Sequence, residues 1–196
     1  MITDDDYLYY VDRALDGMTG IVAGLGDELA NERPPIPGAN SPYALLTHCL
    51  GVVSFWGGAM VAGREVVRDR DGEFTSAGPV GPLLDRAAAV RAQLAEDVRA
   101  AAYGEGLRGT PPPGFLGPDR ELTQGAALFH VYEELAQHHG QMEILRDAIL
   151  AGRARQAGYP GRVESAGRSE PVGPVGRAGR SEPVGWTGPA ESTGMY

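Results

Sequence analysis

Residues 128–149 read LFHVYEELAQHHGQMEILRDAI, and this stretch decides the fold. Its apolar residues and one histidine recur in alternating steps of three and four: Leu128, Val131, Leu135, His138, Met142, Leu145 and Ile149. Only a helix keeps positions with this spacing on one side, so the stretch predicts an amphipathic helix. Thr123 is the expected N-cap of this helix and Gly152 its expected C-cap.

Three more helices are predicted before this one. The first has its apolar stripe between Leu8 and Leu29, with the acidic run 4–6 at its start. The second is capped by Ser41, has Pro42 at its first position and extends to about Gly63. The third opens at Pro82 and stops near Gly104. No segment alternates apolar and polar residues long enough to predict a strand, so we expect an all-α four-helix bundle.

The carboxyl-terminal segment differs from the rest in composition. Residues 153–196 hold 9 Gly and 5 Pro, and the octapeptide AGRSEPVG occurs at 166–173 and again at 178–185. Large apolar residues that could offset the entropy of ordering are scarce there. We therefore expect a helical domain over residues 1–152 and a disordered Gly/Pro-rich tail over residues 153–196.

Composition excludes several classes of chemistry. The 17 basic residues are all Arg, which rules out a Schiff-base lysine and a phosphate-binding lysine of the Walker type. Cys49 is the single cysteine, so an internal disulfide or a cysteine-rich zinc module cannot form. The formal charge of −9 argues against nucleic-acid binding.

Neither a secretory signal nor a membrane span is expected. The amino terminus lacks a basic region followed by an apolar run, which favours a cytoplasmic protein. The uncharged stretch 41–63 has the length of a membrane span, but it contains His48 and several glycines, so a buried helix is the better interpretation. The long apolar helices make a homodimer an expectation as well.

One group of polar residues falls on the predicted core faces. His48 lies midway along the second helix, and Glu134 and His138, four residues apart, share one face of the fourth. Two imidazoles and a carboxylate between facing helices can hold a divalent metal and leave one position open. Spacing alone leaves two alternatives: an ordinary Glu–His surface pair, and a core histidine at position 48.

Neighbouring polar residues have less defined roles. His130 lies one turn before Glu134 and is either a partner that holds Glu134, a proton relay, or a partly exposed polar residue. Gln141 lies near the direction of His138 and could hydrogen-bond a ligand. His139 should face solvent or a neighbouring helix. Cys49 is expected in the core. Arg64, Arg68 and Arg70 could bind a substrate carboxylate, but a solvated surface is the better interpretation of their positions.

The segment HVYEELAQHHGQ at 130–141 resembles the last-helix signature of the DinB-like superfamily of metal-binding four-helix bundles, and LLTHCLG at 45–51 resembles its second-helix motif. Most members carry His-x-x-x-His on the last helix, whereas this chain has Glu134 and His138. The Glu-x-x-x-His form is similar to the branch of mycothiol-dependent maleylpyruvate isomerase. The resemblance covers about residues 1–152 and implies His48, Glu134 and His138 as metal ligands.

The same resemblance implies a function. Many DinB-like proteins are thiol S-transferases or thiol-dependent isomerases, with zinc as the implied metal and nickel as the alternative. The lysine-free, Ala- and Gly-rich composition suits a GC-rich, actinobacterial genome, whose thiol would be mycothiol. We therefore expect a mycothiol S-transferase that acts on a small electrophile in detoxification or secondary metabolism. The alternatives are a metal-dependent hydrolase and a non-catalytic metal- or ligand-binding bundle.

Overall fold

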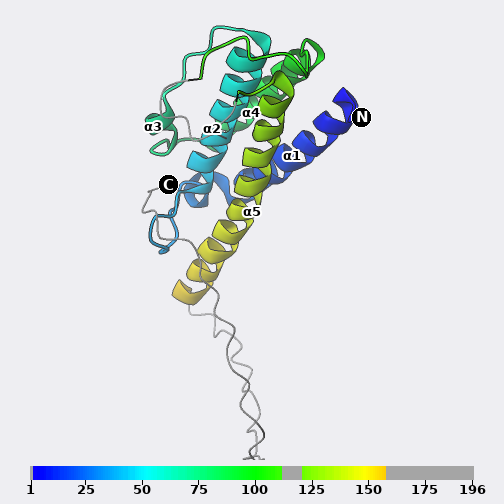
Figure 1. Ribbon diagram of the computed structural model, residues 1–196. Coiled ribbons are helices and arrows are strands. Elements are labelled where there is room, and N and C mark those ends of the chain that lie inside the picture. Colours follow the sequence, from blue (N-terminus) through cyan, green and yellow to red (C-terminus); the bar gives the residue numbers. More distant parts are fainter. Residues whose placement is uncertain (1, 112–120, 158–196) are drawn as a thin grey trace, which may run out of the picture. The chain divides into compact units, whose positions relative to one another are not determined.

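The computed structural model describes residues 2–111 and 121–157, and the described part is all-helical. Four long helical segments lie along one another: α1 (Asp4–Leu29), α2 (Pro42–Val53) continued by η1 (Ser54–Ala62), α4 (Val80–Arg99) and α5 (Gln124–Gln156). A short α3 (Arg70–Glu73) lies in the connection between η1 and α4 (Figure 1). The predicted all-α bundle is confirmed, and α3 is an addition to it.

Helix α1 begins where its capping groups predict. Thr3 and Asp6 form a reciprocal capping box, in which each side chain accepts from the backbone of the other residue. The buried side of α1 carries the predicted stripe, including Val11 and Met18, which are fully enclosed. Near the other end Gly26 has φ 68° and ψ −179°, so the backbone kinks there before the helix ends.

Helix α2 and η1 form one continuous helical segment inside the bundle. Ser41 accepts from the backbone N–H of Ala44, and Pro42 occupies the first turn. From Ser54 onward the helix widens to π-type hydrogen bonding, which the sequence did not predict, and left-handed Gly63 (φ 73°) ends it. Pro42–Ala62 is apolar and long enough to cross a membrane, and 83% of its most apolar window is buried within the protein.

Two predicted helix ends are corrected. Helix α4 ends at Arg99, before the predicted stop near Gly104. Helix α5 begins at Gln124 with Thr123 as its N-cap, as predicted, but it continues through Gly152 to Gln156. The Gly152 C-cap was therefore wrong. Gly152 does not adopt the left-handed backbone of a C-cap glycine, and in the added turn Arg153 donates to Glu28 and Glu32 near the end of α1.

One hydrophobic core joins the helices. Leu135 and Met142 of α5 are completely buried and belong to the same cluster as the enclosed residues of α1, α2 and α4. Tyr7 of α1 donates its hydroxyl to the carbonyl of Leu128 across the bundle, 2.8 Å away. Helix α5 therefore lies against both α1 and α2, which fixes its rotation about its own axis. The predicted tail lies outside the described residues from position 158 onward.

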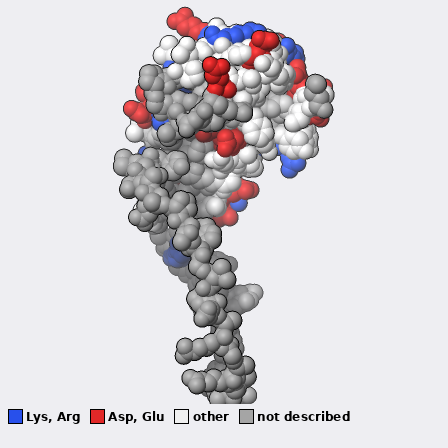
Figure 2. All heavy atoms as spheres, viewed as in Figure 1, with Lys and Arg blue, Asp and Glu red and all other residues white. Residues whose placement is uncertain are grey.

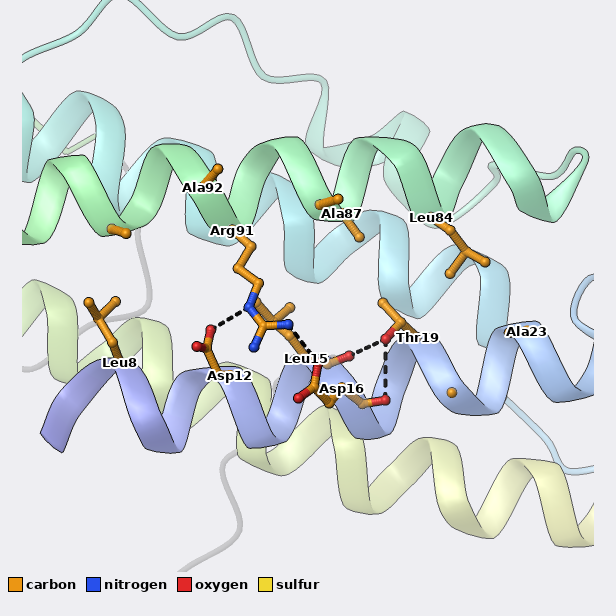
Figure 3. A pocket seen from close by; sticks show the side chains of 13 residues that line it. Leu8, Asp12, Leu15, Asp16, Thr19, Ala23, Leu84, Ala87, Arg91 and Ala92 are labelled. Atoms are coloured by element: carbon orange, nitrogen blue, oxygen red, sulfur yellow. Dashed lines mark hydrogen bonds and ion pairs between the residues drawn. The ribbon is translucent and has the colours of Figure 1, made fainter. Parts of the chain in front are cut away.

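The outer surface carries charges of both signs. On the face shown in Figure 2, acidic and basic side chains lie in small groups around an uncharged area. Between α1 and α4 lies a groove lined mainly by alanines and other small or apolar side chains. Figure 3 shows Arg91 of α4 crossing this groove to donate to Asp12 and Asp16 of α1.

Candidate metal centre

The bundle brings together the three residues proposed as ligands. His48 comes from α2, and Glu134 and His138 come from adjacent turns of α5. One donor atom from each of the three lies within 4.8 Å of the other two. Glu134 is central, since its Oε2 lies 3.4 Å from Nε2 of His48 and 3.4 Å from Nε2 of His138. Glu134 and His138 therefore do not form a pair by themselves, and His48 is buried, 4% exposed, as the alternative of a core histidine also predicts.

The two distances from Glu134 fit the coordination sphere of a small divalent metal, and the two imidazole nitrogens lie within 4.8 Å of each other. A tetrahedral centre with bonds of about 2.0–2.1 Å sets its donor atoms about 3.3 Å apart. Glu134 Oε2 is separated from each imidazole nitrogen by 3.4 Å, which matches that spacing and is longer than a strong hydrogen bond. The side chain of His48 is 5% exposed, whereas those of Glu134 and His138 are 27% and 22% exposed, so the group opens on the α5 side.

The outer nitrogen of each imidazole is occupied by an acceptor. His48 Nδ1 lies 2.9 Å from Oε2 of Glu73, and His138 Nδ1 lies 2.9 Å from Oε1 of Gln141. A carboxylate or carbonyl oxygen only accepts, and both imidazole nitrogens face such an oxygen, but the contacts of Nδ1 at 2.9 Å are shorter than the 3.4 Å between Nε2 and Glu134. In a neutral ring the proton is therefore on Nδ1 and the lone pair on Nε2. Two imidazole lone pairs and one carboxylate oxygen therefore converge, and such a donor set suits a bound cation.

The same convergence shifts the pKa values of the group. Hydrogen bonds from His138 and then His48 hold the pKa of Glu134 far below its ordinary value, in spite of its partial burial. For His48, burial disfavours the charged ring, but hydrogen bonds to Glu134 and Glu73 outweigh it and raise the pKa. The shifts favour the deprotonated carboxylate of Glu134 and the protonated imidazole of His48. Both therefore indicate a negative electrostatic potential at the site, which attracts positive charge.

Glu73 and Arg68 are part of the site, and sequence reasoning missed them. Glu73 is 5% exposed, and both of its oxygens accept from Arg68, at 2.7 and 2.9 Å. Arg68 was predicted to be solvated, but its side chain is only 13% exposed. The spacing of apolar residues could not have predicted this pair, because Arg68 and Glu73 lie in the connection between η1 and α4 and not on a long amphipathic helix. They reach His48 only when this connection folds over α2.

The other two arginines of this connection have different surroundings. Arg64 was also predicted to be solvated, but it donates twice to Asp97 of α4, whose side chain is 3% exposed. The Arg64 side chain is 37% exposed, so it reaches solvent as predicted, but it also serves as the partner that the buried carboxylate of Asp97 requires. Arg70 is exposed, as predicted, and its guanidinium lies over the ring of Phe74.

The remaining histidines separate into two environments. His130 lies near the site: its Nε2 is 3.8 Å from Oε1 of Glu134. Its ring also meets the edge of buried Trp56, with centroids 5.1 Å apart. His139 packs against α1, where a Cβ added at Gly17 would lie 2.0 Å from its ring. Of the two environments foreseen for His139, a neighbouring helix is the one observed.

Cys49 lies next to His48 but belongs to the core. It is completely buried, and burial, followed by the negative charges of Glu134 and Glu73, raises the pKa of its thiol well above the ordinary value. A buried, protonated thiol is a poor nucleophile. The predicted core role is confirmed, and any reactive thiol must come from another molecule.

Comparison with known proteins identifies the family of the chain. No curated protein shows significant similarity to the chain. A family model described as Mycothiol-S-transferase matches residues 7–151, a range that includes His48, Glu73, Glu134 and His138 and ends within α5. This match covers most of the chain and nearly all of its described residues, and the chain therefore belongs to the mycothiol-S-transferase family.

Proposed function

We propose that this protein is a divalent-metal-dependent S-transferase that uses mycothiol as the nucleophile on a small electrophile. One observation supports it above all: in a chain of this family, Glu134 Oε2 lies 3.4 Å from the inward nitrogens of both His48 and His138. The fold supplies no reactive thiol of its own, since Cys49 is buried. A thiol nucleophile would therefore have to come from a second molecule, as it does if mycothiol is the substrate.

Zinc is the metal we propose, with nickel as the alternative. Two imidazole nitrogens and one carboxylate oxygen are common zinc ligands, and three protein ligands leave a position open. Glu73 and Arg68 form a pair at 2.7 Å and together add no net charge, so among the three proposed ligands and this pair Glu134 is the anion that an arginine does not balance. A divalent metal held by His48, Glu134 and His138 would keep about one positive charge, and that charge would lower the pKa of a thiol bound to it.

The protein's own side chains then have distinct tasks. His48 and His138 present their inward lone pairs because Glu73 and Gln141 occupy the outer nitrogens. The partial exposure of Glu134 and His138 allows a small molecule to approach from the α5 side. In the transfer, the thiol loses its proton to the medium, its sulfur forms a bond to carbon, and the leaving group departs with the electron pair.

The proposal is tested with the purified full chain. Metal content is measured by mass spectrometry, and mycothiol conjugation is followed with a panel of fluorogenic and chloro-aromatic electrophiles, before and after metal removal. We expect one divalent metal per chain, conjugation that chelation abolishes, and recovery when zinc is restored. A protein without stoichiometric metal, or conjugation that is unaffected by chelation, would contradict the proposal.

Calorimetric titration with mycothiol distinguishes the remaining alternatives. Tight binding to metal-loaded but not metal-stripped protein supports the transferase. Hydrolysis of activated esters by metal-loaded protein that does not bind mycothiol would instead support a metal-dependent hydrolase. Metal-dependent mycothiol binding without conjugation of any electrophile would point to a binding module.

A further inference from the structure

We propose that Glu73 is a positioning residue that fixes the tautomer and ring orientation of His48. This inference rests on the metal site proposed above and goes beyond its three ligands. Glu73 belongs to the short helix α3, in the connection between η1 and α4, and its side chain is 6% exposed. A carboxylate buried to this degree is costly unless each oxygen is satisfied, so its placement calls for a physical explanation.

Both oxygens of Glu73 are engaged in a defined way. Oε2 accepts from His48 Nδ1 at 2.9 Å and from Arg68 Nη2 at 2.9 Å, while Oε1 accepts from Arg68 Nε at 2.7 Å. Arg68 and Glu73 thus form a bidentate ion pair, in which Nε and Nη2 each donate to one carboxylate oxygen. Arg68 also lies over the ring of Phe55, 5.7 Å from its centroid, and the ring of Phe74 stacks on His48 at 4.5 Å. The hydrogen bond to Glu73 and the stacking of Phe74 therefore restrict the rotation of the His48 ring.

Gly51 of α2 provides the space that Glu73 fills. A Cβ built at Gly51 would lie 1.9 Å from Oε1 of Glu73 and 2.6 Å from its carboxyl carbon. No real pair of atoms approaches so closely, so any larger residue would displace the carboxylate. Gly51 is one helical turn after His48, which places this space directly beside the ligand. The contact makes it possible to move Glu73 without changing any ligand or any charge.

Loss of Glu73 would invert the tautomer of His48. Arg68 Nη2 lies 3.5 Å from His48 Nδ1, and a guanidinium only donates. With the carboxylate in place, Nδ1 carries the proton and Nε2 offers its lone pair towards Glu134. Without the carboxylate, the nearest partner of Nδ1 is a donor, so the proton moves to Nε2. That nitrogen then no longer coordinates a metal.

The test compares Gly51→Ala with Gly20→Ala. Gly20 lies on the exposed side of α1, with no atom within 4 Å of an added Cβ, so its variant makes the same chemical change without a clash. Zinc affinity is measured by competition with a chromogenic chelator. We expect Gly51→Ala to bind zinc about 10–100-fold more weakly than the unmodified protein, as for other partners of ligating histidines. Gly20→Ala should bind zinc normally.

A second pair of variants acts on Glu73 itself. Glu73→Ala removes the acceptor, whereas Glu73→Gln retains a carbonyl oxygen that can accept from His48 Nδ1. Glu73→Ala should weaken zinc binding as much as Gly51→Ala, and Glu73→Gln should recover most of the affinity. If Gly51→Ala does not fold, as judged by circular dichroism, the Glu73 pair decides. Zinc affinity unchanged in folded Gly51→Ala or Glu73→Ala would overturn the proposal.

Nitrogen-15 spectra of the histidines separate this inference from the proposed function. In metal-free protein at alkaline pH, His48 should carry its proton on Nδ1, and in Glu73→Ala on Nε2. This readout requires neither metal nor catalysis. If the unmodified protein binds no metal but the tautomer still switches, the proposed function fails and the positioning role stands. If the tautomer is the same in both proteins, the positioning role fails whatever the activity.

Discussion

Replacing His138 with alanine should weaken metal binding by about two orders of magnitude. Structural zinc sites with four protein ligands contribute about 10–16 kcal/mol, so one ligand contributes on the order of 3 kcal/mol. This corresponds to about a 100-fold change in Kd. The His138 side chain is 22% exposed, so water can take its place, which keeps the loss at this level instead of eliminating the site. Glu134 and His48 would remain.

The assay is zinc competition with a chelator on the full chain, with metal content of the purified variant as a second measurement. His139→Ala is the matched control, because it removes the adjacent imidazole, which packs against Gly17 of α1 away from the ligands. His139→Ala should retain metal affinity even if it unfolds at a lower temperature. Circular dichroism establishes that both variants are folded.

A folded His138→Ala variant that binds zinc within about threefold of the unmodified protein would refute the reasoning. The geometry would then require a different third ligand, and His130 is the nearest other imidazole to Glu134, with Nε2 3.8 Å from its Oε1. Equal losses in His138→Ala and His139→Ala would refute it as well, because the effect would then come from the helix and not from the ligand.

Three further predictions follow from the same contacts. In metal-free protein, the raised pKa of His48 contributes stability below pH 6.5 that is lost as pH rises, while the lowered pKa of Glu134 contributes stability above pH 4.5 that is lost as pH falls. The thermal unfolding temperature, plotted against pH, should therefore have a maximum between pH 4.5 and 6.5. The Glu134→Gln variant should show a smaller change of unfolding temperature with pH. Leu135→Ala, at a fully buried position, should cost about 2–5 kcal/mol in denaturant unfolding. Cys49 should react with thiol reagents only at the rate of unfolding, because it is fully buried; rapid labelling of native protein would contradict this.

Most of the helices could be predicted from the sequence, because helix formation depends on residues that are close together in the chain. The three-four spacing from Leu128 to Ile149 and the caps Ser41 and Thr123 act within one or two turns of the chain. The predicted end of α5 failed because Gly152 keeps a helical backbone instead of the left-handed one that a C-cap glycine needs. In the turn that follows, Arg153 pairs with Glu28 and Glu32, which are far away in sequence.

The candidate site divides in the same way. Glu134 and His138 were paired by helical spacing, and His48 joined them through the resemblance of its motif. Their mutual distances, however, depend on how α2 packs on α5. Arg68 and Glu73 were beyond sequence reasoning, because a polar residue in an irregular connection becomes buried only when that connection folds over a neighbouring helix.

The sequence by itself determined the helices, the donor types and the absence of an internal disulfide or lysine chemistry, because these follow from residue identity and local periodicity. Only the tertiary structure decided that three donors from two helices converge and that the carboxylate of Glu73 lies 2.9 Å from Nδ1 of His48. The physical reason is one of range: hydrogen bonding and packing within a helix act over a few residues, whereas a metal site depends on side chains that 86 positions separate, such as His48 and Glu134.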